Sequence, residues 1–328
     1  MLTILMTALS SVASADTPPP PIAAPAQELL PDIFLLPGAS YPSRGPDGNT
    51  VVFVAPAGLV VVDTGRHIWH SQGILNFASG KSATIAAIVN THWHLDHSSG
   101  NGRLRAVFPN APLYASSAID KALTGFLARS AQDTRERLAS GSLNEVQTEE
   151  AQNFLATMTS PQMLRPDIVI AQSSQMSIAG REFDVHLAQN AATDGDVWLF
   201  DKKNRIAVVG DLVTLPAPYL DTACPGGWSK ALDEIEGTPF DVAIPGHGRP
   251  MTHDQFVTYR SAFRALIECA NAATDSNDCA ASWVRNVGVL LGADEAMHQR
   301  ALLVSESYIR FLRKNGGKSP DCQEATSK

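Results

Sequence analysis

The stretch Thr91–Asn101, THWHLDHSSGN, places four metal-type side chains close together: His92, His94, Asp96 and His97. Imidazoles combined with a carboxylate suit Zn²⁺ or iron far better than Ca²⁺ or Mg²⁺, which prefer oxygen ligands. The stretch therefore predicts a metal centre. It also raises the question of which other residues complete the coordination.

The apolar run Ile85–Val89 comes directly before this stretch and is too short for a core helix, so it predicts a buried strand. The same order, an apolar run followed by a loop of glycine or metal-type residues, recurs later in the chain. The later instances are FDVHL before AQNAATDGD, IAVV before Gly210-Asp211, and DVAI before Pro245-Gly246-His247-Gly248. Because side chains at the same ends of neighbouring strands lie close together in space, we expect these loops to converge.

The remaining pattern predicts a mixed α/β fold. Further short strands are expected at Ile33–Leu36, Val51–Ala55 and Leu59–Val62, the last two joined by a hairpin. From about Ser116 to Ser160 the sequence is polar and helical, which is typical of a solvated insert or of a lid over the metal loops.

The tail of the chain predicts helices without chemistry of their own. A capping box begins at Thr252, and later helices are expected at Trp283–Leu291 and Glu295–Leu312. We therefore divide residues 29–328 into a metal-binding domain, 29–252, and a helical C-terminal extension, 253–328.

The N-terminus predicts export. Residues 1–15, MLTILMTALSSVASA, form a short apolar stretch that ends in Ala13-Ser14-Ala15, a pattern typical of a cleaved signal peptide, although no Lys or Arg precedes the apolar part. Residues 16–28 include TPPPP and predict a proline-rich linker. No later run is apolar enough to span a membrane, so we expect an exported protein, periplasmic or secreted.

Four cysteines, an even number, agree with an oxidising compartment. They are Cys224, Cys269, Cys279 and Cys322, and they allow three pairings. Cys269 with Cys279 is the local candidate, and buried or free thiols are the alternative. No two of them have the C-x-x-C spacing of a thiolate zinc site.

Composition and charge exclude some classes of partner. The chain has 328 residues, 44% of them hydrophobic, which is enough for a sizeable core. Its formal net charge of −8 includes no run of Lys or Arg, so a nucleic-acid partner is not expected. A small-molecule substrate that is neutral or cationic fits this charge better, and the oligomeric state is left open.

In their order along the chain, these motifs resemble the metallo-β-lactamase superfamily. The resemblance rests on the His-x-His-x-Asp-His stretch, then TDGD, then Gly210-Asp211 and Gly246-His247-Gly248, over residues 29 to about 250. It implies an αββα metallo-β-lactamase sandwich, here with a helical insert and a C-terminal helical extension. It also implies two zinc ions at one edge of the sheets and an early structural aspartate, Asp63.

The resemblance assigns the metal ligands residue by residue. The first site receives His92 and His94, the second receives Asp96, His97 and His247, and Asp211 falls where an aspartate bridges both ions in many members. One or two zinc ions per chain are thus implied, with the second site the more secure.

The third histidine of the first site is missing. Ala192 stands where family members have the histidine of His-Thr-x-Gly-Asp, so the first site is expected to bind its ion more weakly. His186, on the preceding strand, is an alternative ligand that also has a plain structural explanation.

The resemblance implies a zinc-dependent hydrolase in which metal-bound hydroxide attacks an ester, thioester, lactone or amide, with Asp96 as a ligand that accepts or passes a proton. Ala192 predicts reduced activity. An exported β-lactamase is one alternative, against which stands Asp211, because β-lactamases of this fold generally have Cys or Ser there. A catalytically impaired metal- or ligand-binding protein is the other alternative.

Overall fold

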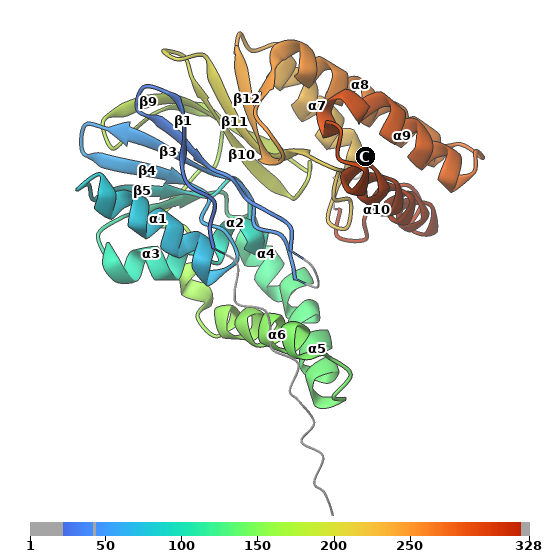
Figure 1. The fold of residues 1–328 in the computed structure, drawn as a ribbon, viewed down its shortest axis with the longest axis horizontal. Coiled ribbons are helices and arrows are strands. Elements are labelled where there is room, and N and C mark those ends of the chain that lie inside the picture. The colour runs from blue at the N-terminus through green and yellow to red at the C-terminus, as the bar shows by residue number, and fades with distance from the viewer. Residues whose placement is uncertain (1–21, 42–43, 323–328) are drawn as a thin grey trace, which may run out of the picture.

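The computed structural model describes residues 22–41 and 44–322. The expected signal peptide, 1–15, and the expected linker as far as residue 21 lie outside the described residues. Two β-sheets lie face to face in the middle of the molecule, and helices cover their outer faces (Figure 1). The predicted α/β fold, an αββα sandwich, is confirmed.

The first sheet contains strands in the order β1-β2-β3-β4-β5-β6-β7. They are β1 (Gln27–Leu30), β2 (Ile33–Leu36), β3 (Thr50–Ala55), β4 (Gly58–Val62), β5 (Ile85–Val89), β6 (Leu113–Ala115) and β7 (Ile168–Val169). Strands β2 to β5 match the predicted ones closely. The sequence did not predict β6 and β7, because three and two residues are too few for a recognisable period. It also did not predict β1, which is mostly exposed and begins inside the segment expected as linker.

The second sheet has the order β13-β12-β11-β10-β9-β8. Its strands are β8 (Ser174–Ile178), β9 (Arg181–Gln189), β10 (Gly195–Asp201), β11 (Ile206–Thr214), β12 (Val242–His247) and β13 (Met251–Thr252). The predicted runs FDVHL, IAVV and DVAI lie in β9, β11 and β12. Strands β8, β10 and β13 were not predicted. Strand β10 begins inside the TDGD stretch, which was expected to be a loop.

Apolar side chains fill the space between the sheets and beneath the helices. Between the sheets, Phe53 and Phe183 pack edge to face with ring centroids 5.0 Å apart. Against the first sheet lie α1 (Ile68–Gly80) and α3 (Asn101–Val107); against the second lie α7 (Pro225–Glu236) and α8 (His253–Asn271). The sandwich thus supplies a rigid base for the loops at its end.

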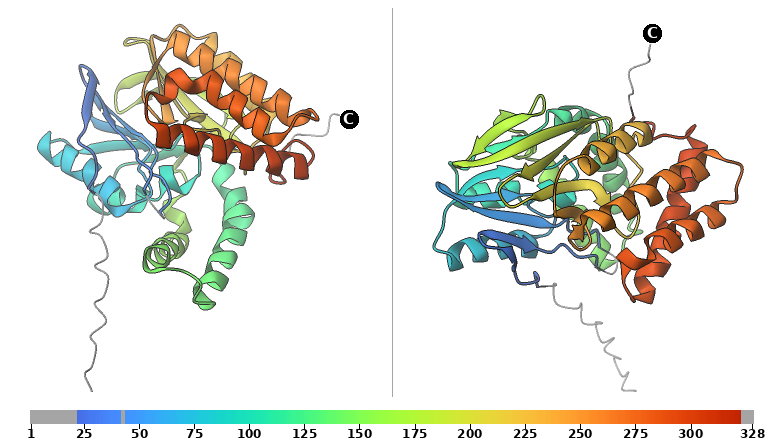
Figure 2. Two further views of the ribbon diagram at one scale, coloured as in Figure 1. Left: turned by 45° about the vertical axis from the view of Figure 1, so that its right-hand side comes forward. Right: turned by 90° about the horizontal axis from the view of Figure 1, so that it is seen from above.

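The polar helical segment forms an insert that projects from the sandwich. It contains α4 (Ala118–Thr124), α5 (Phe126–Ala139) and α6 (Glu145–Met158), and is followed by a 3₁₀ turn, η1 (Pro161–Met163). Figure 2 shows α5 and α6 as a pair of helices extending away from the sheets. The insert packs on the metal-motif segment through Trp93, whose ring centroid is 5.5 Å from that of Phe126.

The C-terminal extension is helical, as predicted. Thr252 and Gln255 form the predicted capping box at the start of α8. Helices α9 (Ser276–Leu291) and α10 (Glu295–Lys314) follow, and α9 starts earlier than expected because Asp275 caps it.

Both cysteine pairs form disulfides. Cys269 and Cys279 join α8 to α9, which confirms the local candidate, and Cys224 joins Cys322 across a sequence separation of 98 residues. The alternative of free thiols is wrong, since all four cysteines are paired. The second disulfide ties the start of α7 to the segment that follows α10.

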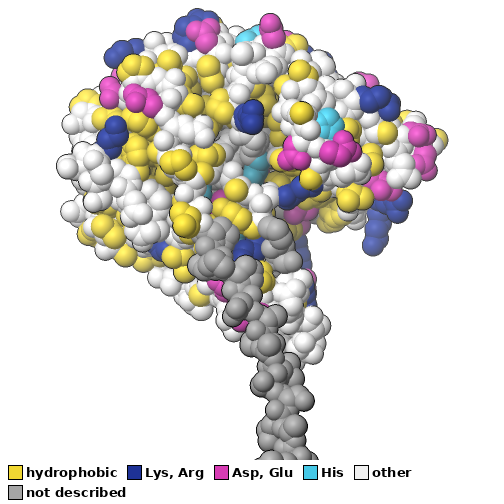
Figure 3. Space-filling view, in the orientation of Figure 1, with side chains coloured by type: hydrophobic (Ala, Val, Ile, Leu, Met, Phe, Trp, Pro, Cys, Tyr) yellow, Lys and Arg dark blue, Asp and Glu magenta, His cyan; other side chains and the backbone are white. Residues whose placement is uncertain are grey.

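On the face in Figure 3, acidic and basic side chains are interspersed, most visibly over the C-terminal helices at the upper right. Within the described residues, no helix is both long and apolar enough to cross a membrane.

Candidate metal centre

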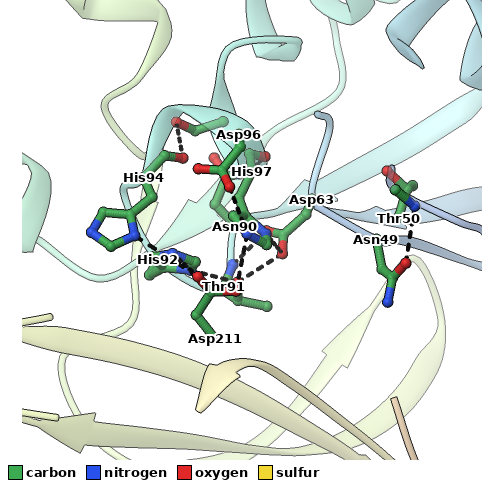
Figure 4. A network of polar contacts seen from close by, with 12 residues as sticks. Asn49, Thr50, Asp63, Asn90, Thr91, His92, His94, Asp96, His97 and Asp211 are labelled. Carbon is green, nitrogen blue, oxygen red and sulfur yellow. Dashed lines mark hydrogen bonds and ion pairs between the residues drawn. The ribbon is translucent and has the colours of Figure 1, made fainter. Parts of the chain in front are cut away.

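The predicted ligands meet at the ends of three strands. The turn after β5 runs into the short helix α2 (Leu95–Ser98) and holds the motif histidines, β11 holds Asp211, and β12 ends at His247. Figure 4 shows the side chains of the motif and Asp211 pointing toward one another. The expected convergence of these loops is therefore present in the structure.

The first group consists of His92, His94 and Asp211, whose ligand atoms lie within 4.8 Å of one another. Asp211 Oδ2 is 3.5 Å from His92 Nε2 and 3.9 Å from His94 Nδ1. Both histidines therefore direct one ring nitrogen toward the same carboxylate oxygen.

The second group consists of Asp96, His97 and His247, whose ligand atoms also lie within 4.8 Å of one another. His247 Nε2 is 3.0 Å from Asp96 Oδ2 and 3.2 Å from His97 Nε2. The other oxygen of Asp211, Oδ1, is 3.1 Å from His97 Nε2. Asp211 thus lies between the two groups and presents one oxygen to each.

The unpaired atoms of this cluster fit metal ions. His92 Nε2 and both carboxylate oxygens of Asp211 are buried and have no hydrogen-bond partner. A buried polar group without a partner is costly and rare, and imidazole with carboxylate is a typical donor set for zinc. The residues present therefore fit two zinc ions with Asp211 between them.

Charge in the first group suits metal binding at neutral pH. Burial lowers the pKa of His92 to about 4, which leaves its ring neutral. Burial raises the pKa of Asp211, but the neighbouring His97, His247 and His92 outweigh burial and hold the pKa well below its usual range. Neutral imidazole beside ionised carboxylate is the protonation state that a metal requires. In the second group, burial lowers the pKa of His97, but Asp211, Asp63 and Asp96 outweigh burial and raise the pKa well above its usual value, so this ring would release a proton on binding a metal.

Hydrogen bonds behind the ligands determine which ring nitrogen each histidine offers. His97 Nδ1 is 2.8 Å from Asp63 Oδ2, so Nε2 is left to face the cluster. The Thr91 hydroxyl donates to the same carboxylate oxygen at 2.7 Å, so it accepts from His92 Nδ1 at 3.0 Å. Asp63, predicted as a structural aspartate, thus orients two histidines, one directly and one through Thr91.

His94 is oriented from another part of the chain. Its Nε2 is 3.0 Å from Thr222 Oγ1, and this hydroxyl donates to the carbonyl oxygen of Ala192 at 2.9 Å. The hydroxyl has one proton, so it accepts from His94 Nε2–H, and Nδ1 is left to face Asp211. Sequence analysis did not identify Thr222, because no motif surrounds it.

Two glycines allow the backbone to approach the ligands closely. A Cβ at Gly48 would lie 2.2 Å from His97 Cε1, and one at Gly246 would lie 2.0 Å from Asp211 Oδ1. Next to Gly48, the Asn49 side chain donates to the carbonyl oxygens of Pro245 and Gly248 at 2.8 and 2.9 Å. The loop before β3 is therefore fastened to the end of β12.

Ala192 and His186 take different positions. Ala192 is buried after β9, and its carbonyl contacts Thr222 beside His94. His186 instead stacks on Trp198 with ring centroids 3.7 Å apart, and its Nδ1 is 2.9 Å from Glu234 on α7. His186 therefore belongs to the helix-covered face of the second sheet and not to either ligand group.

A cleft of about 420 Å³ opens beside the cluster and is lined by His94 and Asp96. Its apolar wall includes Trp93 and the insert residues Phe126 and Phe154, and two arginines also line it, Arg66 and, from α10, Arg300. Arg66 Nη2 is 3.8 Å from Asp96 Oδ1. The insert thus forms part of the wall beside the metal loops, as one of its two interpretations expected. Arg66 and Arg300 were not predicted, because neither lies in a motif.

An αββα sandwich with two carboxylate-linked histidine groups at its strand ends defines a class of metal-binding hydrolase folds. The chain belongs to the metallo-beta-lactamase superfamily, whose family model matches residues 44–247.

The sequence is similar to that of a known enzyme. A linear primary-alkylsulfatase from Pseudomonas sp. (strain ATCC 19151) is 26% identical in an alignment of 228 positions, which covers 60% of this chain and 41% of the alkylsulfatase. The chain thus spans less than half the length of this relative.

Solved structures show the same fold at low sequence identity. A metallo-beta-lactamase from Pontibacter korlensis is 18% identical with a TM-score of 0.53, covering 73% of this chain and 98% of that one. A stereoselective inverting sec-alkylsulfatase from Pseudomonas sp. is 17% identical with a TM-score of 0.57, covering 88% of this chain and 50% of that one.

Proposed function

We propose that the protein is an exported, zinc-dependent hydrolase that uses both ligand groups. The observation that carries this proposal is Asp211, whose two buried oxygens have no hydrogen-bond partner and face different histidine pairs. The two disulfides support an oxidising compartment and therefore export.

The residues of the cluster hold and orient the reacting groups. His92, His94 and Asp211 would hold the first ion, and Asp96, His97 and His247 with Asp211 the second. Zinc, when bound, lowers the pKa of a coordinated water to about 7 and so supplies a nucleophile at neutral pH.

Asp96 is the residue best placed to handle a proton. Its Oδ2 faces His247 at 3.0 Å, while its Oδ1 faces Arg66 at 3.8 Å and the residue lines the cleft. Burial raises the pKa of Asp96, but His97 and His247 outweigh burial and lower the pKa, so the carboxylate is ionised. Its position on the cleft, and not its basicity, makes Oδ1 the candidate proton acceptor.

The cleft favours an ester with an acidic group and an apolar part. Arg66 and Arg300 provide positive charge, whereas Trp93, Phe126 and Phe154 provide an apolar wall. Sulfate-ester hydrolysis is accordingly the second candidate function, supported by the alkylsulfatase relative together with these arginines. The β-lactamase alternative has support only from the shared fold.

The test combines metal analysis with a substrate screen. Purified protein loaded with zinc would be assayed against a carboxylic ester, a thioester, a lactone, a β-lactam, a phosphodiester and a medium-chain alkyl sulfate. We expect turnover of an anionic ester, and we expect Arg300→Gln to raise KM for that ester while leaving KM for a neutral ester unchanged. Zinc-loaded protein that turns over none of these compounds would instead support the impaired binding protein.

A further inference from the structure

The loop between β11 and α7 connects the first ligand group to the C-terminus. Within this loop, Thr222 is buried and contacts both His94 and the carbonyl of Ala192. Two residues later, the backbone N–H of Cys224 donates to the carbonyl of Ala191 at 2.9 Å. The loop is therefore hydrogen-bonded to the backbone of Ala191 and Ala192, and Ala192 takes the place of the third histidine.

The C-terminal segment fastens the same loop from the other side. The disulfide joins Cys224 to Cys322, and the Ser319 backbone N–H donates to the carbonyl of Ala223 at 3.2 Å. The hydroxyl of Ser319 also donates to the carbonyl of Asp221 at 2.5 Å. Backbone contacts thus flank Thr222 closely and limit how far its hydroxyl can move from His94.

We propose that Thr222 is a positioning residue for the first metal site and that the Cys224–Cys322 disulfide holds it in place. Thr222 fixes His94 with its proton on Nε2, so that Nδ1 is available as a ligand. With alanine at position 192, only two histidines serve this site, and each must be oriented by the protein. The proposal rests on the metal binding in the proposed function but not on turnover.

The first experiment removes the hydroxyl. Thr222→Val keeps the branched side chain but removes both contacts of the hydroxyl, to His94 and to the Ala192 carbonyl. Thr222→Ser keeps the hydroxyl and serves as the matched control. Zinc titration by calorimetry should show about 10- to 100-fold weaker binding of the weaker ion in Thr222→Val, with the tighter ion and the Thr222→Ser protein unchanged.

A second readout needs no metal. In metal-free protein labelled with ¹⁵N-histidine, the ring nitrogens of His94, assigned by His94→Gln, should report the Nε2–H form in wild type and a mixture of forms in Thr222→Val. This readout decides the proposal even for a wild type that binds one zinc only, and it is independent of whether any substrate is hydrolysed.

The disulfide is tested with its own control. Cys224→Ala/Cys322→Ala should weaken the first site in the same direction as Thr222→Val, whereas Cys269→Ala/Cys279→Ala should leave both zinc affinities unchanged. Reductant added to the Cys269→Ala/Cys279→Ala protein acts on the Cys224–Cys322 disulfide alone and replaces the first double variant where that one does not fold. The proposal is overturned if Thr222→Val keeps the His94 ring form of wild type, or if opening Cys224–Cys322 leaves the weaker zinc affinity unchanged.

Discussion

The two ligand groups are supported by different kinds of contact. The second group rests on a buried charge, because Asp63 lies directly behind His97 at 2.8 Å. The first group rests on neutral hydroxyls, Thr91 behind His92 and Thr222 behind His94, and the second of these lies in a loop held by a disulfide. Loss of the Asp63 charge should therefore affect the second group most, and reduction of the Cys224–Cys322 disulfide should affect the first group.

This difference affects how strongly each site should hold its zinc ion. A carboxylate behind an imidazole fixes the ring and increases its basicity, whereas a hydroxyl mainly fixes the ring. The first site has the weaker kind of support and also lacks a histidine at position 192. Its affinity for zinc should consequently depend more strongly on each remaining contact.

The largest effect is expected from removing the residue that both groups share. Asp211→Ala deletes the two oxygens that face His92, His94 and His97, so both zinc affinities should fall by more than about 100-fold. Zinc content after gel filtration should be below one per chain, and hydrolysis should be lost. A variant that retains one tightly bound zinc would show that the groups do not depend on a common carboxylate.

Removing the charge of Asp63 should affect the second site most. Asp63→Asn keeps the side-chain shape but loses the carboxylate behind His97, so zinc affinity at the second site should fall by about 10- to 100-fold. Thr91→Val is the matched comparison, because it should mainly weaken the first site through His92. Equal losses at both sites in both variants would contradict the division of support.

Restoring the missing histidine should reduce the difference between the sites. Ala192→His should raise zinc content toward two per chain and strengthen first-site binding by about tenfold or more, with faster turnover of any substrate found. His186→Ala is the control and should leave zinc content unchanged, because His186 pairs with Glu234 on another face. If Ala192→His changes nothing and His186→Ala abolishes binding, His186 is the true third histidine.

The sequence predicted the ligand groups because a few compact motifs, each after an apolar run, define them. Asp96 and His97 share one turn, Asp211 follows the apolar run IAVV within β11, and His247 ends β12. The capping box at Thr252 was equally clear, since it depends on two side chains three residues apart. Local chemistry of this kind can be read without knowledge of the fold.

The supporting contacts could not be predicted in the same way. Thr222 and Ala192 are 30 residues apart in sequence, and Cys224 and Cys322 are 98 apart. Their contacts follow from how loops pack, which no periodic pattern records. The cleft residues Arg66 and Arg300 were missed for the same reason, because one follows β4 and the other lies on α10.

The smallest effect is expected where the N-terminal loops meet the insert. His67 lies between two carboxylates: its Nδ1 is 2.8 Å from Asp47 and its Nε2 is 3.1 Å from Glu150 on α6. Burial lowers the pKa of His67, but hydrogen bonds to these carboxylates outweigh burial and raise the pKa. Burial raises the pKa of Asp47 and Glu150, but hydrogen bonding to His67 outweighs burial and lowers both values.

These shifts give the pairing a defined pH window. The contribution of His67 is complete below the ordinary imidazole pKa of about 6.5 and is lost as pH rises through its raised value. The contribution of the carboxylates is complete above about pH 4 to 4.5 and is lost as pH falls through their lowered values. The pairing should therefore stabilise the protein most between about pH 5 and 6.5.

Glu150→Gln should lower the free energy of unfolding by about 1–2 kcal/mol at pH 6 and by less at pH 9, because the charge of His67 is lost as pH rises through its raised pKa. Urea unfolding at the two pH values measures the difference. Glu149→Gln is the control, since this neighbour pairs with Arg44 but is 46% exposed and should contribute less than about 1 kcal/mol at either pH. Glu150 also accepts from Arg44 and from the backbone N–H of Gly45. A loss for Glu150→Gln that is the same at pH 6 and pH 9 would show that these contacts, and not the charge of His67, account for its contribution.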